Sequence, residues 1–191
     1  MGLAARRGDL VFVLAGEPHR KLYGLQLYRA GYAPRILLSV GRFEIRRFAE
    51  LDLPYPAGSV PLDLLAARPT SLRERHFFVA FSAQDVSFEK IPLGRLGTLR
   101  EIRALAKWCK ERPEIASLIV VSSGYHLRRV RLCCRALLPS AIGVIYAAVP
   151  EETDVHKWEL ALELLKLPLY AAVLAGVWLA RTIRGFVGPT F

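Results

Sequence analysis

Residues 118–130 read LIVVSSGYHLRRV, and this stretch decides the fold. Its apolar run, closed by Ser-Ser-Gly, predicts a buried strand that leads directly into a helix. The same pattern recurs along the chain, with strands expected at 10–15, 36–40, 76–82, 118–122 and 142–148. Strands that alternate with helices are typical of a parallel sheet covered by helices. We therefore predict an α/β fold, Rossmann-like with three αβα layers, and a mainly parallel sheet of about five strands.

Helical patterns fill the segments between these strands. The expected helices cover residues 19–30, 42–50, 98–111 and 125–138, with a short one at 62–67 and a long one from 154. Pro168 is expected to break or kink the last of them. We expect an α/β ligand-binding domain at 1–153 and a C-terminal apolar helix at 154–191.

The composition excludes a disordered chain and favours negatively charged partners. Hydrophobic residues make up 53% of the 191 residues, too many for intrinsic disorder. The 27 Lys and Arg outnumber the 17 Asp and Glu, for a formal net charge of +10. Such an excess favours phosphorylated metabolites, acidic lipids or nucleic acid, although an arginine-rich solvated surface is the alternative. No motif with aromatic and basic stacking residues is present, so no nucleic acid is expected.

The cysteines indicate neither a disulfide framework nor a metal site. There are three of them, Cys109, Cys133 and Cys134, and no further Cys/His cluster accompanies them. We expect reduced core thiols and no bound metal. Residues 1–9 contain no apolar run that resembles a signal peptide, so we expect a cytoplasmic protein.

Small residues followed by a cation stand at the ends of the first two predicted strands. Gly16 precedes Arg20, and Ser39 and Gly41 precede Arg42. Because parallel strands bring their carboxyl ends to one edge of a sheet, these residues are expected to meet there. The sequence therefore predicts a cationic pocket at this edge for a phosphorylated ligand.

The end of the fourth predicted strand adds the strongest candidates. Ser122 and Ser123 supply hydroxyl groups, and the helix that follows directs free N–H groups at the same edge. His126 and Arg129 lie three residues apart on one helical face. Imidazole titrates near neutral pH, which makes His126 a candidate proton donor or general acid–base.

The alternative is that Ser123 only caps the helix and Arg129 lies at the surface. Spacing places the remaining arginines of this helix toward solvent: Arg128, Arg131 and Arg135.

Other motifs are ambiguous or missing. Thr98 and Glu101 match a helix capping box, Thr-x-x-Glu. The sequence contains no Walker-type loop, no Gly-x-Gly-x-x-Gly and no Gly-x-Ser-x-Gly elbow, which excludes the usual nucleotide-binding loops and the α/β-hydrolase nucleophile.

The C-terminal helix suits a membrane surface better than a membrane span. Residues 167–180 carry no charge, but at 1.5 Å per residue they reach only about 21 Å, against about 30 Å of hydrocarbon. We expect this helix to lie in the interface on the inner face of the plasma membrane, with Trp178, Arg181 and Arg184 near the headgroups. The alternatives are a helix docked on a partner and one buried in a homodimer.

Several of these segments resemble the bacterial SanA/YdcF/ElyC-type family. The resemblance covers most of the chain except residues 42–96. The segments that match are Gly16 with Arg20, then Leu27-Tyr28-Arg29-Ala30-Gly31, Ser39-Val40-Gly41, the Tyr125-His126-x-x-Arg129 segment, and a Glu163-x-x-Lys166-x-x-x-Tyr170 tail.

The resemblance implies a role in cell-envelope or surface-polysaccharide metabolism. The ligand would be a phosphorylated intermediate, such as a polyprenyl-phosphate-linked one, that the protein binds, hydrolyses or transfers. S-adenosylmethionine is a further candidate ligand that the resemblance implies. A non-catalytic assembly factor for a membrane-associated envelope enzyme is the alternative function. Thr98, Glu101 and Tyr125 would join the ligand site.

One departure from the family pattern bears on catalysis. Pro92, Arg95 and Gly97 stand where such proteins carry an acid, a serine and an asparagine. The chain would then bind its ligand without turnover, or it would recruit Glu17 or Asp85 as the acid.

Overall fold

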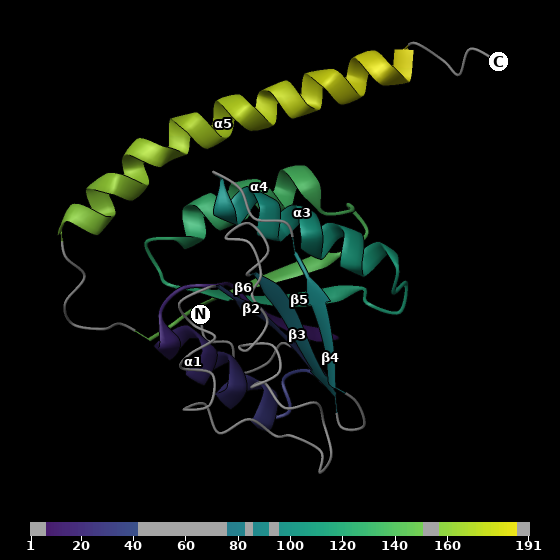
Figure 1. The fold of residues 1–191 in the computed structure, drawn as a ribbon, viewed down its shortest axis with the longest axis vertical. Helices are drawn as coiled ribbons and strands as arrows, with labels where there is room; N and C mark the ends of the chain where they lie inside the picture. Colours follow the sequence, from purple (N-terminus) through teal and green to yellow (C-terminus); the bar gives the residue numbers. More distant parts are fainter. Residues whose placement is uncertain (1–6, 42–75, 83–85, 92–95, 151–156, 187–191) are drawn as a thin grey trace, which may run out of the picture.

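The computed structural model describes residues 7–41, 76–82, 86–91, 96–150 and 157–186. Within these ranges the chain is a mixed α/β protein with a mostly parallel six-stranded sheet and four helices (Figure 1). The strands are β1 (Leu10–Val13), β2 (Arg35–Val40), β3 (Phe77–Ser82), β4 (Val86–Lys90), β5 (Ser117–Ser122) and β6 (Gly143–Ala148). The helices are α1 (Pro18–Arg29), α3 (Gly97–Lys110), α4 (Leu127–Leu137) and α5 (Lys157–Phe186). The helices predicted at 42–50 and 62–67 lie outside the described residues.

The centre of the sheet is parallel and fully buried. The strand order is β4-β3-β2-β1-β5-β6, and β2, β1, β5 and β6 run in the same direction. Val11 of β1 pairs with Ile36 of β2 and with Ile119 of β5. Parallel strands that are covered on both faces read as continuous apolar runs, which is why the sequence shows them so clearly.

The strand expected at 76–82, β3, is not parallel to its neighbours, although alternating strands and helices indicate a parallel sheet. β3 runs antiparallel to β2, and β4 runs antiparallel to β3. Ser82 therefore pairs with Arg35 at the start of β2, on the edge of the sheet opposite the predicted site. His76, which directly precedes β3, lies instead beside the carboxyl end of β2, at the edge where the site was predicted. No strand was predicted at residues 86–90, but Val86 and Phe88 alternate with polar residues as half-buried strand residues do.

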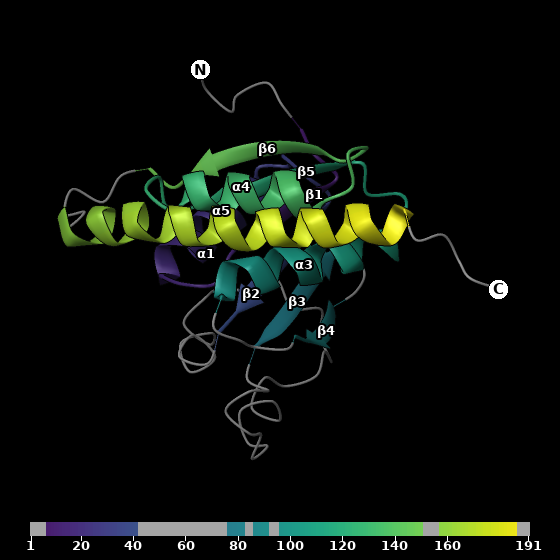
Figure 2. The ribbon, with the colours of Figure 1, turned by 90° about the horizontal axis from the view of Figure 1, so that it is seen from above.

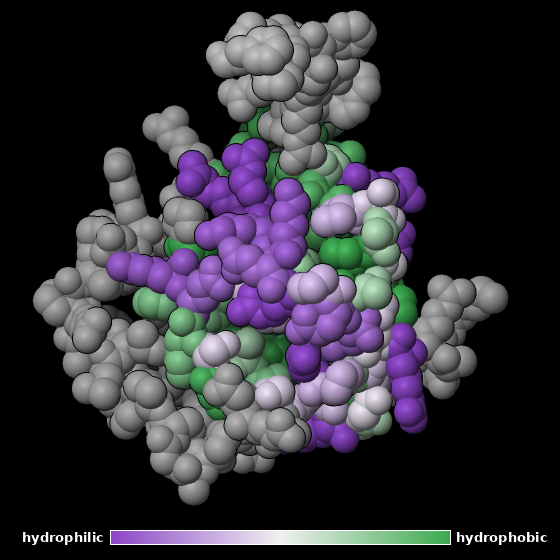
Figure 3. All heavy atoms as spheres, turned by 90° about the vertical axis from the view of Figure 1, so that its right-hand side faces the viewer, coloured by the Kyte–Doolittle hydropathy of each residue, from purple (hydrophilic) through white to green (hydrophobic). Residues whose placement is uncertain are grey.

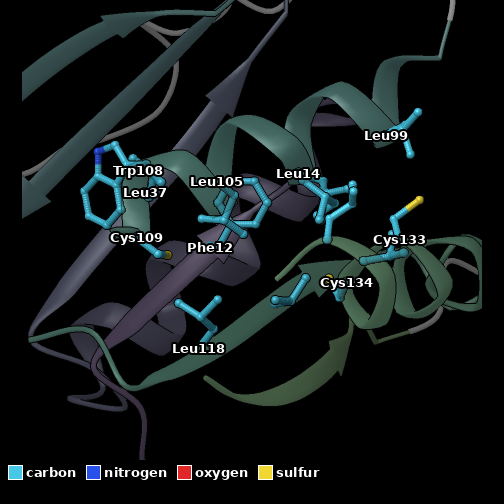
Figure 4. Close-up of a cluster of buried hydrophobic side chains, with 14 of the residues drawn as sticks. Phe12, Leu14, Leu37, Leu99, Leu105, Trp108, Cys109, Leu118, Cys133 and Cys134 are labelled. Atoms are coloured by element: carbon cyan, nitrogen blue, oxygen red, sulfur yellow. The ribbon is translucent and has the colours of Figure 1, made fainter. Parts of the chain in front are cut away.

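Helices cover both faces of the sheet. On one face, Leu25 and Leu27 of α1 pack with alternate residues of β1 and β2. Gly24 allows this approach, because a Cβ there would overlap the side chain of Val13. On the other face, α3 and α4 enclose a core that includes Phe12 and Leu105 (Figure 4).

The cysteines belong to this second core. All three are buried and free, which confirms the prediction of core thiols. Burial raises the pKa of Cys109 to about 11 and that of Cys133 and Cys134 to about 12. They are therefore protonated at neutral pH and poor nucleophiles.

The C-terminal helix packs across the outer side of α4 (Figure 2). α5 is one continuous helix of 30 residues, and the break expected at Pro168 is not present. Tyr170 and Leu174 are buried and belong to the same apolar cluster as the core residues of α3 and α4. Among the residues that the structure describes, no helix is long and apolar enough to cross a membrane.

Candidate functional site

The carboxyl ends of β1, β2 and β5 collect most of the residues that the sequence singled out. The polar side chains gathered here are buried: Arg20, Ser39, Thr98, Glu101, Ser122, Ser123, His126 and Arg129. Burial of so many polar groups is stable only when they pair with one another or with a ligand.

Arg20 links the start of α1 to the start of α4. Its Nε donates to Oγ of Ser123 at 2.9 Å, and its Nη1 donates to the carbonyl oxygen of Ala15 at 2.8 Å. Its Nη2 lies 3.5 Å from the hydroxyl of the half-buried Tyr125. Gly16 has a φ of +135°, and a Cβ there would overlap the guanidinium group. Glycine is therefore needed at the end of β1 for both conformation and space.

Glu101 reaches from α3 to the ends of β1 and β2. Its Oε1 accepts a hydrogen bond from the backbone N–H of Ala15 at 2.9 Å and from the hydroxyl of Ser39 at 2.6 Å. Nε2 of His76 lies 2.6 Å from the same hydroxyl. Because the one proton of Ser39 goes to the carboxylate, His76 donates to the oxygen. His76 enters this group only through the antiparallel direction of β3, so sequence reasoning missed it.

The capping interpretations are wrong for both helices. Leu96 precedes the first turn of α3, and no side-chain cap is formed. Thr98 contacts His126 instead, and Glu101 binds Ala15 and Ser39 at the strand ends. His126 is the N-cap residue of α4, again without a side-chain cap. The hydroxyl of Ser123 accepts a hydrogen bond from Nε of Arg20 and does not cap α4.

His126 is a neutral imidazole held between Thr98 and Arg129. Nη2 of Arg129 lies 2.7 Å from Nδ1, and since arginine can only donate, Nδ1 is the acceptor. We therefore assign the proton to Nε2, 3.2 Å from Oγ1 of Thr98. Burial, and then the charges of Arg129 and Arg20, lower the pKa of His126 despite the opposing effect of Glu163.

A carboxylate from α5 completes this group. Oε2 of Glu163 lies 2.9 Å from Nη1 of Arg129 and 3.4 Å from Nδ1 of His126. Nζ of Lys166 donates to the other carboxylate oxygen at 3.3 Å, and the guanidinium of Arg129 stands 5.0 Å over the ring of Tyr170. The Glu163-x-x-Lys166-x-x-x-Tyr170 spacing was visible in the sequence, since it places all three residues on one helical face.

Two buried donors of the site have no hydrogen-bond partner among the described residues. They are Oγ of Ser122 and Nε of Arg129. Ser122 alternates along β5 with Leu118 and Val120, which pack toward α3 and α4, so it faces the same side of the sheet as Arg129. Unpaired buried donors are rare and destabilising, which makes both atoms candidate contacts for an anionic ligand.

The other predicted residues are less closely tied to the site. Gly41 directly follows β2, whereas Arg42 and Asp85 lie outside the described residues. Glu17 is exposed before α1 and does not cap it, so its catalytic role stays a prediction. Arg129 is buried as a site residue should be, which excludes its surface alternative. The exposed arginines of α4 are the predicted ones: Arg128, Arg131 and Arg135.

No metal site is visible in the described ranges, where no group of three or more His, Cys, Asp or Glu side chains could hold an ion. Comparisons of the chain with protein-family models, curated proteins and solved structures find no match. The resemblance to the SanA/YdcF/ElyC-type family therefore stays a prediction, and function must be inferred from the geometry of the site.

Proposed function

We propose that the protein binds a phosphorylated ligand at the carboxyl ends of β1, β2 and β5. The observation that carries the proposal is the pair of unsatisfied buried donors, Ser122 Oγ and Arg129 Nε. Arg20 adds a second guanidinium group near enough for its charge to lower the pKa of His126. Guanidinium groups, hydroxyls and the positive end of a helix are the usual partners of phosphate.

Phosphate fits the charge of the site better than a carboxylate does. Arg129 already faces the carboxylate of Glu163, so a ligand must compete with a negative charge that belongs to the protein. A phosphate monoester carries about −1.5 to −2 at neutral pH and offers three acceptor oxygens. It therefore gains more from two guanidinium groups than a single carboxylate would.

The outer face of α5 supports a lipid-linked form of this ligand and a place at the membrane surface. Five leucines of α5 are at least half exposed: Leu162, Leu164, Leu165, Leu169 and Leu179. Hydrophilic side chains, in contrast, gather across the middle of the molecular face in Figure 3. With a net charge of +10, the protein is suited to an anionic membrane surface. We propose a polyprenyl phosphate of the cell envelope, bound by a Rossmann-like three-layer domain on the cytoplasmic side.

The same apolar face favours a second candidate function, that of a non-catalytic assembly factor. In that case α5 would dock on a membrane-associated enzyme of the envelope. A chemical reaction is not part of the first proposal, because the neutral His126 is buried and its assigned Nε2 proton faces Thr98.

The test is titration calorimetry with inorganic phosphate and with farnesyl phosphate, a short polyprenyl phosphate. Arg129→Gln should weaken binding of both at least tenfold, by loss of a charge-assisted contact. Arg128→Gln is the matched control, since it removes the same charge from an exposed neighbour on α4 and should leave affinity unchanged. Equal affinity in both variants and the wild type would remove the support for this site. Assembly by α5 alone predicts co-purification of an envelope enzyme that survives Arg129→Gln but is lost on truncation after Pro150.

A further inference from the structure

We infer that the carboxylate of Glu163 occupies the position on Arg129 that the anionic group of the ligand takes when it binds. In the free protein α5 therefore covers the site, and the part of α5 around Glu163 moves away on binding. The inference rests on the proposed function and adds the regulation of the same site.

The first reason is the way in which the carboxylate meets Arg129. An arginine normally binds a carboxylate with two parallel N–H groups. Here Oε2 of Glu163 lies 2.9 Å from Nη1 but does not reach hydrogen-bond geometry. Nη2 is used by His126, and Nε has no partner in the described part of the chain. Glu163 therefore neutralises the charge of Arg129 without satisfying its donors.

The second reason is the surroundings of the carboxylate. Glu163 is buried, and its neighbours are the cations Arg129 and Lys166 and the imidazole of His126. The charge of Arg129 is no longer compensated once Glu163 moves away. A phosphate that displaced the carboxylate would meet this guanidinium group, with Nε as an additional donor.

The third reason is that α5 can move near Glu163 without leaving the protein. Tyr170 and Leu174, two and three turns further along, are buried in the core and anchor the helix. Among residues 161–166, by contrast, Glu163 is the only buried residue, and the others are exposed or half-exposed. Displacement of the carboxylate therefore requires only the first half of α5 to rise, while the anchor stays in place.

The test compares the affinity of full-length variants for inorganic phosphate by titration calorimetry. Glu163→Gln keeps the shape and removes the charge, and it should bind phosphate about tenfold more tightly than the wild type, which is about 1.4 kcal/mol. Glu163→Asp keeps the charge and should stay within about threefold of the wild type. Glu111→Gln removes an equal charge from the exposed end of α3, and it should leave the affinity unchanged.

Hydrogen exchange on the wild-type protein gives a second measurement that needs no variant. Saturating phosphate should speed amide exchange in residues 161–166 and leave residues 170–174 slow. Tighter binding by Glu163→Gln together with this pattern supports the inference. Binding to the wild type that is equal or weaker in Glu163→Gln, or exchange that slows around Glu163, overturns it and leaves the proposed function standing. Absence of binding to both proteins overturns the proposed function as well.

Discussion

Ser122→Ala separates the stability of the fold from the proposed binding of phosphate. Ser122 is fully buried at the end of β5, and its hydroxyl has no partner among the described residues. Its neighbour Ser123 is also buried, but it accepts a hydrogen bond from Nε of Arg20 at 2.9 Å. The two alanine variants remove the same atom from adjacent positions, which makes Ser123→Ala the matched comparison.

The expected magnitudes follow from these contacts. Removal of an unpaired hydroxyl takes away a group whose burial costs about 1–3 kcal/mol, so Ser122→Ala should leave the free energy of unfolding unchanged or raise it by up to about 1 kcal/mol. Ser123→Ala leaves a donor of buried Arg20 unsatisfied and should lower that free energy by about 1–3 kcal/mol. If Ser122 donates to the phosphate, the loss of a hydrogen bond to a charged group should weaken binding by about 1.5–3 kcal/mol, at least tenfold in Kd.

Urea unfolding measures the first quantity, and calorimetric titration with inorganic phosphate measures the second. The expected result for Ser122→Ala is full stability with weakened binding. A loss of stability as large as that of Ser123→Ala would show that Ser122 is already paired in the free protein. Unchanged affinity in Ser122→Ala would exclude its hydroxyl from the binding site.

Two further predictions concern packing and pH. Gly24→Ala should lower the free energy of unfolding by about 1–2 kcal/mol in urea, because the new methyl group overlaps Val13; Gly97→Ala, where the structure leaves open space, is the control and should change it by less than about 1 kcal/mol. Acid should lower the free energy of unfolding. The pKa values of His126 and Glu163 are both lowered in the folded protein, so the unfolded chain binds more protons as the pH falls. In urea titrations at successive pH values, stability should fall first below the ordinary histidine pKa near 6.5 and again below the ordinary glutamate pKa near 4.5. Glu163→Gln should make the second fall smaller, while the lowered pKa of Asp9 keeps part of it; stability that rises on acidification would contradict the assignment.

Local sequence patterns predict most of the strands and helices and several of the buried site residues. The central strands are continuous apolar runs, and the ends of β1, β2 and β5 carry the small or polar residues that were expected there. Helical spacing, together with a place in the first turn beside His126, distinguished the buried Arg129 from the exposed Arg128. These features depend on neighbours within one or two turns of the chain, so a single sequence reveals them.

The remaining features depend on contacts between distant segments. The antiparallel direction of β3 is set by its pairing with β2 and β4, which the order of strands and helices along the chain does not show. Glu101 matches a capping box by spacing, and only the closeness of Ser39 and Ala15 shows that it joins the strand ends. Glu163 reaches Arg129 because α5 returns across α4, and no local pattern predicts that return.

The central claim is that one anion is held between the ends of β1 and β5 and the first turn of α4. Crystals soaked with tungstate, a phosphate analogue that anomalous scattering locates, test it most directly. Tungstate is expected within hydrogen-bond distance of Nε of Arg129 and Oγ of Ser122. Tungstate found only at the exposed arginines of α4, with Ser122 and Arg129 untouched, would contradict it.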